Sequence, residues 1–295
     1  MKHLAFFLIF ILLISWLSGC TPDHSADLVA TTLPVYEFTS RLCQGTNLTV
    51  TRLITESVSC LHDYTLQVNQ MLAIENAQAV VISGAGLEDF LDDALAGAKN
   101  IIDASQGVSL LHAEHHHHDH HHDHHHEHTD AGDPHIWLSP KYAKTMAENI
   151  CRSLTQLYPE YTAHFDTNLV ALLAELDSLQ SYGEEALQDL HCRQLITFHD
   201  GFSYLADSFD LHILEAVEEE SGSEASAAQL KHLIQLAQTH SLPAIFTERS
   251  GSASAANIIT AETGLPAYSL DMAMSGDSYF AAMYHNINTL REALQ

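Results

Sequence analysis

Short apolar runs alternate with helix-like segments along this chain, and the alternation occurs twice, which limits the fold more than any other feature. The runs, rich in β-branched residues, lie at 28–32, 48–51, 79–82, 101–102, 195–198, 211–214, 244–247 and 267–270. Helix-like patterns lie between or after them, at 34–43, 63–77, 86–97, 200–209, 224–239, 252–263 and 277–294. Buried strands that alternate with helices form parallel sheets. The sequence therefore predicts an α/β fold with two lobes, each a four-stranded, mainly parallel sheet flanked by helices.

The segment between the two halves carries apolar residues at helical spacing. They are Phe165, Leu169, Leu172, Leu173, Leu176, Leu179 and Leu187. A helix at about 140–156 is followed, after the break at Pro159, by one helix over about 160–188, which would be roughly 40 Å long. A single rigid connection of this kind predicts small movements of the lobes. The domain boundaries are then an N-terminal α/β lobe at 28–158 with a His-rich loop at 112–131, a connecting helix at 159–189 and a C-terminal α/β lobe at 190–295.

The N-terminal residues have the features of a secretory signal. Lys2 precedes an apolar run over 4–17 that is too short for a comfortable membrane span. The tetrapeptide Leu-Ser-Gly-Cys that ends at Cys20 resembles the lipobox of bacterial lipoproteins, in which the cysteine becomes the lipid-carrying first residue. We predict a lipoprotein signal peptide at 1–19, a tether at 20–27, and an extracytoplasmic protein that is lipid-anchored to the bacterial cell membrane. The alternative is a plain membrane anchor or cleaved signal that places a cysteine there by chance.

Net charge and cysteine spacing exclude several classes of function. The formal charge of −27 argues against nucleic-acid binding, because a phosphate backbone needs a basic partner surface. Beyond Cys20, four cysteines remain, with no Cys-x-x-Cys pair, so neither a redox centre nor a zinc ribbon is indicated. These four, which permit two disulfides in an oxidising compartment or stay thiols in an anaerobic one, are Cys43, Cys60, Cys151 and Cys192.

A histidine tract interrupts the first half of the chain. Eleven histidines fall within fourteen residues, broken only by Asp119, Asp123 and Glu127. They are His115, His116, His117, His118, His120, His121, His122, His124, His125, His126 and His128. Neutral imidazole binds zinc and copper, and a reference pKa of about 6.5 leaves most such side chains uncharged at neutral pH. An affinity tag or a solvated linker without a role would have similar composition, but the tract is internal and holds nearly half of the 23 histidines, so we interpret it as a metal-capturing loop.

Side chains that bind metals also follow several predicted strands. They are His62, His135, His199, Glu248 and Asp271. In open α/β sheets ligands bind beyond the carboxyl ends of the strands, so both lobes would contribute to one centre. Three imidazoles and one carboxylate form a complete tetrahedral zinc shell with no open position, which suits carrying a metal better than catalysis with it.

Each of these residues also has a purely structural interpretation. His62 lies where an exposed loop or the start of a helix is expected, and His135 follows Asp-Pro, which is typical of a turn. Asp271 could cap the final helix, and Glu248 could form a surface ion pair with Arg249. The joint placement of the set favours the metal site over these separate roles.

Several stretches around these residues resemble the metal-binding cluster of ABC-transporter solute-binding proteins, the cluster A-I family, and in particular its zinc-uptake lipoproteins. The stretches are Cys60-Leu61-His62-Asp63-Tyr64-Thr65-Leu66, Gly84-Ala85-Gly86-Leu87-Glu88, Asp133-Pro134-His135-Ile136-Trp137-Leu138-Ser139-Pro140, Phe198-His199-Asp200-Gly201-Phe202-Ser203-Tyr204, Ile245-Phe246-Thr247-Glu248 and Leu270-Asp271. The resemblance covers nearly all of 28–295. It implies two α/β lobes joined by a long helix, with the metal held between them.

The resemblance also implies residue roles and a function. It assigns His62, His135 and His199 as histidine ligands and Asp271 as the carboxylate that completes the shell. Glu248 is the reserve, as a ligand or as an acceptor that orients an imidazole. The manganese-type members place a carboxylate where His199 stands, so the nitrogen-rich set favours Zn²⁺.

The implied protein is a monomeric receptor, not an enzyme, that captures extracytoplasmic Zn²⁺ and delivers it to an ABC permease and its ATPase on other chains. Two departures from the family pattern, Leu61 in place of proline and Met272 after Asp271, concern the fourth ligand. The alternative function is a surface protein that only sequesters metal or adheres to host tissue. A metallohydrolase is disfavoured, because catalytic zinc keeps a water in its fourth position and the chain has no His-Glu-x-x-His motif.

Overall fold

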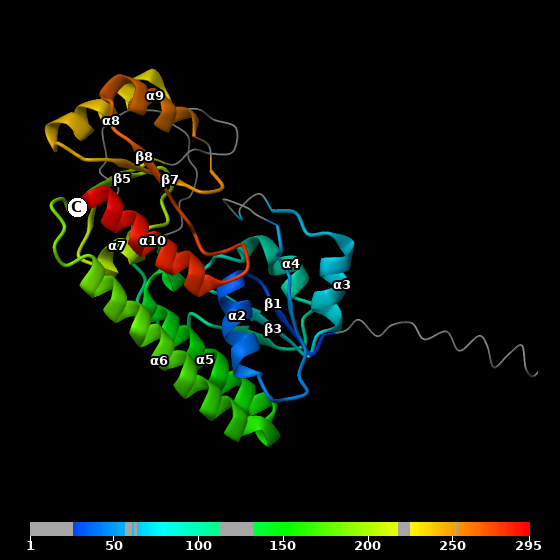
Figure 1. The fold of residues 1–295 in the computed structure, drawn as a ribbon. Helices are drawn as coiled ribbons and strands as arrows, with labels where there is room; N and C mark the ends of the chain where they lie inside the picture. The colour runs from blue at the N-terminus through cyan, green and yellow to red at the C-terminus, as the bar shows by residue number, and fades with distance from the viewer. Residues whose placement is uncertain (1–25, 57–60, 62–63, 112–131, 218–224, 252) are drawn as a thin grey trace, which may run out of the picture.

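The structure, a computed structural model, describes residues 26–56, 61, 64–111, 132–217, 225–251 and 253–295, and it contains two four-stranded parallel sheets (Figure 1). The first sheet has the order β2-β1-β3-β4, with β1 (Leu28–Ala30), β2 (Val50–Arg52), β3 (Ala79–Ile82) and β4 (Ile101–Asp103). The second has the order β6-β5-β7-β8, with β5 (Gln194–Thr197), β6 (His212–Ala216), β7 (Ile245–Glu248) and β8 (Ala267–Leu270). The predicted fold class is confirmed.

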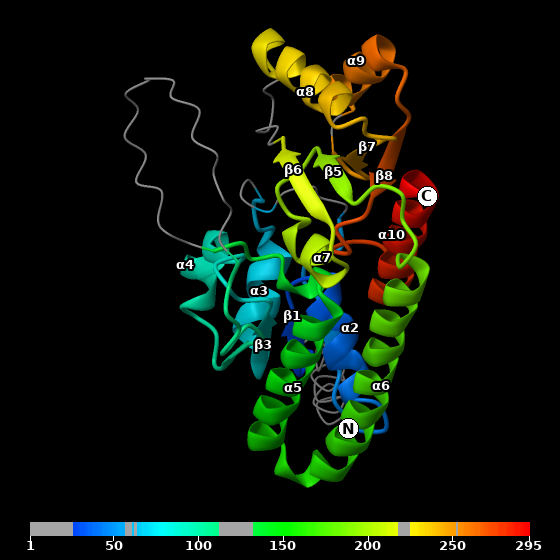
Figure 2. The same ribbon diagram turned by 90° about the vertical axis from the view of Figure 1, so that its left-hand side faces the viewer.

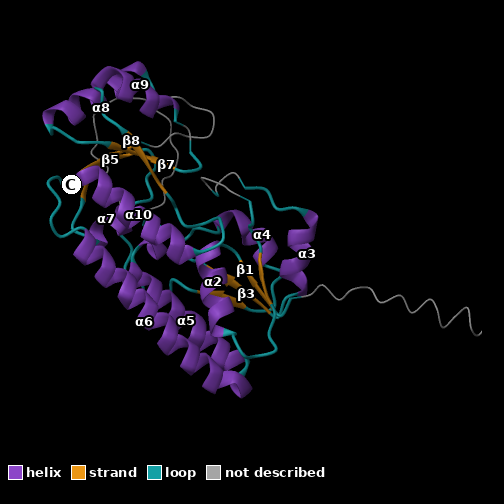
Figure 3. Ribbon diagram, in the orientation of Figure 1, coloured by secondary structure: helices purple, strands orange, loops and turns teal. Residues whose placement is uncertain are grey.

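The first sheet is covered by helices on both faces, which explains why its central strands are continuous apolar runs (Figure 3). Its helices are α2 (Leu33–Leu42), α3 (Val68–Asn76) and α4 (Asp92–Leu95), with a 3₁₀ turn, η1, at Asp89–Leu91. Pro34 lies in the first turn of α2, where its fixed backbone angle fits and its missing N–H is not needed. Val35, Phe38 and Leu42 of α2 are fully buried against the sheet.

The helix predicted over 86–97 is replaced by η1 and the short α4. Three consecutive residues, Gly84, Ala85 and Gly86, have positive φ angles of 82°, 57° and 86°, which are incompatible with a right-handed helix. Gly84 is also required sterically, because a Cβ there would lie 2.0 Å from Asp103 Oδ1. The loop after β3 therefore stays irregular until Asp89.

The second lobe is built in the same way but has two separate cores. Its helices are α7 (Ser203–Ser208), α8 (Ala227–Thr239), α9 (Ser254–Thr263) and α10 (Tyr279–Leu294). α8 and α9 lie together on the side of the sheet remote from the first lobe (Figure 2). They cover a small cluster with Ile196, Phe198 and Ile245, whereas the main core continues from the first lobe into the near side of the second. α8 begins with a capping box, in which Ser226 and Gln229 satisfy each other's backbone N–H groups.

Two long helices pack side by side along one side of the molecule (Figure 1). α5 (Pro140–Leu157) ends before a 3₁₀ turn, η3 (Pro159–Tyr161), and α6 (Thr162–Ala186) then runs from the first lobe to the second. The 25 residues of α6 correspond to roughly 38 Å. The long connecting helix expected from the sequence is therefore present.

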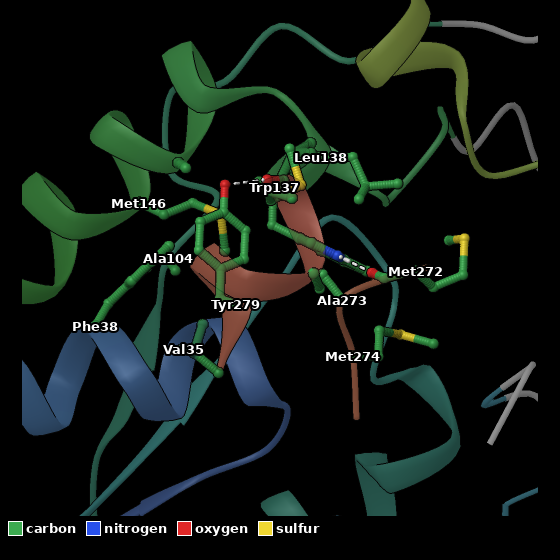
Figure 4. Close-up of a cluster of buried hydrophobic side chains, with 14 of the residues drawn as sticks. Val35, Phe38, Ala104, Trp137, Leu138, Met146, Met272, Ala273, Met274 and Tyr279 are labelled. Carbon is green, nitrogen blue, oxygen red and sulfur yellow. Dashed lines mark hydrogen bonds between the residues drawn. The ribbon is translucent and has the colours of Figure 1, made fainter. Parts of the chain in front are cut away.

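A buried junction connects the lobes beside α5 (Figure 4). Trp137, in the 3₁₀ turn η2 (Ile136–Leu138), donates its Nε1–H to the backbone oxygen of Met272, 2.7 Å away. Tyr279 of α10 donates its hydroxyl to the backbone oxygen of Trp137 at 2.8 Å. Glu37 of α2 accepts a 2.6 Å bond from the Tyr279 N–H, at the start of α10. These bonds fix the segment after β8 against the first lobe.

The described cysteines are not joined by disulfides. Cys43, Cys151 and Cys192 are free thiols, and Cys60 lies outside the described residues. Among the helices that the structure describes, none combines the length and apolar character needed to cross a bilayer.

Candidate metal centre

The second sheet brings three of the predicted side chains to one edge. Glu248 is the last residue of β7, Asp271 directly follows β8, and His199 lies two residues after β5. The three strands are parallel neighbours, so their carboxyl ends share the edge at which ligands bind in such sheets. The sequence-based placement of these residues therefore agrees with the sheet.

His135 reaches the same place from the first lobe. Its imidazole makes an edge-on contact with that of His199, with the ring centroids 5.5 Å apart at an interplanar angle of 80°. The Trp137 ring also makes an edge-on contact with the His135 ring, with the centroids 5.3 Å apart. Two imidazoles from different lobes thus face each other in a largely buried position.

Asp133 fixes the orientation of His135. Its Oδ1 accepts the backbone N–H of His135 at 2.9 Å and lies 2.8 Å from Nδ1 of the ring. Because a carboxylate only accepts hydrogen bonds, Nδ1 carries the proton and Nε2 keeps its lone pair for a metal. The other oxygen, Oδ2, is buried and has no hydrogen-bond partner among the described residues. Sequence reasoning did not identify Asp133, although its spacing of two residues from His135 was the available signal.

The Glu248 side chain lies close to the His199 ring. Its Oε2 is 3.6 Å from Nδ1 of His199, and its side chain is only 3 % exposed. Burial, followed by the negative charge of Asp271, raises the pKa of Glu248 to about 8. This position suits a residue that orients the His199 ring. The backbone of Gly201 lies close to the His199 ring, and a Cβ at this position would be only 2.8 Å from the imidazole.

Asp271 is held by its backbone and bound through both carboxylate oxygens. Asn286 of α10, fully buried, accepts the Asp271 N–H and donates to its backbone oxygen, both at 2.7 Å. The Asp271 Oδ1 accepts the backbone N–H of Ala273 at 2.8 Å, and Oδ2 accepts Nη1 of Arg249 at 3.1 Å. Arg249 therefore pairs with Asp271 and not with Glu248. Asp271 is not the cap of α10 either, since Ser278 fills that role.

Two of the predicted histidine ligands, His135 and His199, are in contact in the structure. Glu248 lies 3.6 Å from His199, and Asp271 is near enough to Glu248 for its charge to raise the Glu248 pKa. His62 and the histidine tract fall outside the described residues. Within the described ranges, no three His, Cys, Asp or Glu side chains are close enough together to hold a metal ion. The donor set nevertheless fits Zn²⁺, because imidazoles with adjacent carboxylates are typical of zinc shells.

Comparison with known proteins gives consistent matches along the chain. The model of the family described as "Zinc-uptake complex component A periplasmic" matches residues 28–293. The high-affinity zinc uptake system protein ZnuA of Bacillus subtilis is 28% identical over 289 residues, covering 94% of this chain and 90% of the relative. The zinc-binding protein AdcA of Streptococcus pyogenes serotype M3 is 30% identical over 290 residues, covering 91% of this chain. The match spans only 56% of AdcA, so this chain corresponds to about half of that relative.

Solved structures match over a similar length. A crystal structure of ZnuA superposes with a TM-score of 0.78 at 27% identity, covering 92% of this chain and all of that one. The Zn(II)-bound ZnuA-like domain of AdcA from Streptococcus pneumoniae gives a TM-score of 0.75 at 26% identity, covering 92% and 99% of the two chains.

Proposed function

The chain belongs to the family of zinc-uptake complex component A proteins, and from this membership we propose how it captures its cargo. Proteins of this family are solute-binding receptors of transport systems and not enzymes. The chain is accordingly an extracytoplasmic zinc-binding receptor of a zinc uptake system. It works with an ABC permease and its ATPase. Zn²⁺ is its cargo.

The contact between His135 and His199 carries the proposal for the site. The two rings come from different lobes and face each other at 5.5 Å, with Nε2 of His135 directed by Asp133. We propose that these two imidazoles and that of His62 bind Zn²⁺ between the lobes. Asp271 completes the shell, with Glu248 as the residue that orients His199. Such a closed tetrahedral shell binds a metal without leaving a position for catalysis.

The remaining sequence features extend this proposal. Lipidation of Cys20 would anchor a monomeric receptor to the membrane. The tract at 112–131 would collect zinc at low affinity and pass it to the site that follows it in the chain. The boundaries at 28–158, 159–189 and 190–295 would separate the two lobes from the connecting helix.

The site is tested by zinc titration followed by X-ray absorption at the zinc edge. A chain without residues 113–130 should bind one Zn²⁺ tightly, with nitrogen and oxygen neighbours at the distances of a four-coordinate shell, about 2.0–2.1 Å. His135→Ala and His199→Ala should each abolish this tight site, whereas His212→Ala, an exposed histidine at the start of β6, should leave it unchanged. Tight binding that survives both site substitutions would refute the interlobe site. Unchanged stoichiometry and unchanged transport at limiting zinc after deletion of 113–130 would refute the role of the tract.

A further inference from the structure

Arg249 and Asp271 directly follow the neighbouring strands β7 and β8, and their side chains meet at the edge of the proposed site. The backbone N–H of Arg249 donates to the oxygen of Leu270 at 2.8 Å, so the pairing of β7 with β8 continues one residue beyond the strands. This register places the two side chains next to each other, with Nη1 of Arg249 3.1 Å from Oδ2 of Asp271. The register of β7 and β8 therefore brings the two side chains into contact, with no long loop between either residue and its strand.

The two partners differ sharply in exposure. The Asp271 side chain is 14 % exposed, whereas that of Arg249 is 66 % exposed. The carboxylate is also anchored, because Asn286 binds its backbone on both sides and the Ala273 N–H occupies Oδ1. The arginine is therefore the partner that can move, and Oδ2 is the oxygen that becomes available when it does.

We propose that Arg249 competes with Zn²⁺ for Asp271. In the unloaded receptor the guanidinium occupies Oδ2, and it must turn into solvent before that oxygen can bind the metal. This inference rests on the proposed function, because it takes Asp271 as a zinc ligand. On release of the metal, Arg249 returns to the carboxylate and neutralises the charge that the cation leaves behind.

The competition sets the sign and size of the effect. Exposed ion pairs are weak, so the state in which Arg249 is paired with Asp271 is favoured over the unpaired state by only a small factor. Only the unpaired state can bind Zn²⁺ through Oδ2, so the apparent zinc affinity falls in proportion to the fraction of receptor in that state. Arg249 should therefore weaken zinc binding about two- to sixfold. A residue that instead positioned Asp271 for the metal would strengthen binding, so the two roles have opposite signs.

Trp137 provides a reporter for this site in the mature chain. Its ring lies 5.3 Å from that of His135, and the only other tryptophan is Trp16. Trp16 lies in the signal peptide expected at 1–19, so in the mature chain Trp137 fluorescence follows zinc at the interlobe site separately from zinc on the histidine tract. Zinc affinity would be measured by competition with a chelator, and zinc dissociation by stopped flow after mixing with excess chelator.

The decisive comparison is a double-mutant cycle with Zn²⁺ as the probe. Arg249→Gln should bind zinc about two- to sixfold more tightly, mainly through slower dissociation, while Arg249→Lys, which keeps the charge, should stay close to the parent. In an Asp271→Asn background, Arg249→Gln should have no effect. Arg152→Gln, which removes one exposed charge from α5, should leave zinc affinity unchanged and serves as the charge control.

The outcomes separate the inference from the function on which it rests. Unchanged or weaker zinc binding by Arg249→Gln would overturn the competition, and so would an equal gain in the Asp271→Asn background. If Asp271→Asn alone leaves zinc affinity unchanged, Asp271 is not a ligand, and the proposed shell is wrong at that position. If Asp271→Asn weakens binding but Arg249→Gln does not strengthen it, the shell stands and only the competition is lost.

Discussion

Asp133 holds His135 at two points through a single oxygen. Its Oδ1 accepts the backbone N–H of His135 at 2.9 Å and contacts the Nδ1 of the same residue at 2.8 Å. The two bonds fix both the backbone and the ring, so they set the tautomer and the direction of Nε2. A carboxylate behind a histidine ligand also makes the ligand more basic.

We expect Asp133→Asn to weaken zinc binding about 10- to 100-fold, the usual cost of losing a carboxylate behind a histidine ligand. The asparagine amide can still accept a hydrogen bond through its oxygen, but it carries no charge. Its NH₂ group can also donate, so it no longer forces the proton of the His135 ring onto Nδ1. Competition titration with a chelator measures the effect. Asp103→Asn, a comparable substitution in the first lobe that leaves His135 untouched, is the control, and equal losses in both variants would contradict a specific role for Asp133.

His199→Ala should lower zinc affinity by several orders of magnitude, because a four-coordinate shell loses one of its bonds. The loss should be larger than that of Glu248→Gln, which keeps a side chain of the same shape 3.6 Å from the His199 ring and replaces only one oxygen of its carboxyl group. Both variants should keep the circular dichroism spectrum of the parent. Tight zinc binding by His199→Ala would remove this residue from the site.

Trp137→Phe should reduce the free energy of unfolding by about 2 kcal/mol, because it leaves the buried backbone oxygen of Met272 without its donor and creates a small cavity. Urea unfolding of the metal-free protein, followed by circular dichroism, measures this change. Tyr279→Phe, which removes only the hydroxyl that donates to Trp137, should cost about 1 kcal/mol. A loss confined to Tyr279→Phe would show that the junction does not depend on the indole.

The sheets could be predicted closely because their strands are short, mainly apolar runs that alternate with helical segments. The runs at 79–82 and 267–270 coincide with β3 and β8, and the ends of the others differ from the observed strands by at most two residues. The helix over 86–97 could not be predicted correctly, because nothing in its composition shows that Ala85 adopts a positive φ between two glycines. Backbone conformation of this kind depends on contacts such as that of Gly84 with Asp103, which are remote in sequence.

The site could be predicted at the strand ends but not in its supporting contacts. Glu248 and Arg249 were adjacent candidates for an ion pair, yet successive residues of a strand point to opposite faces, so one faces His199 and the other faces out. Arg249 then meets Asp271, the residue beside it on the neighbouring strand. Asn286 binds Asp271 from a helix that begins eight residues later, and that contact needs the position of α10.

The carboxyl of Glu88 should make stability depend on pH. Its oxygens accept bonds from Thr31 Oγ1, the Ser83 N–H and the Gly84 N–H, but complete burial outweighs them and raises the pKa of Glu88 from 4.5 to about 7. A raised folded-state pKa stabilises the protein fully below pH 4.5, and this contribution is lost as the pH rises through 7. The parent should therefore lose up to about 3 kcal/mol relative to Glu88→Gln between pH 4 and pH 8, measured by urea unfolding of the metal-free protein. Glu248, whose pKa is also raised, is present in both proteins, so its contribution cancels from this difference. Parallel pH profiles of the two proteins would show that folding does not shift the pKa of Glu88.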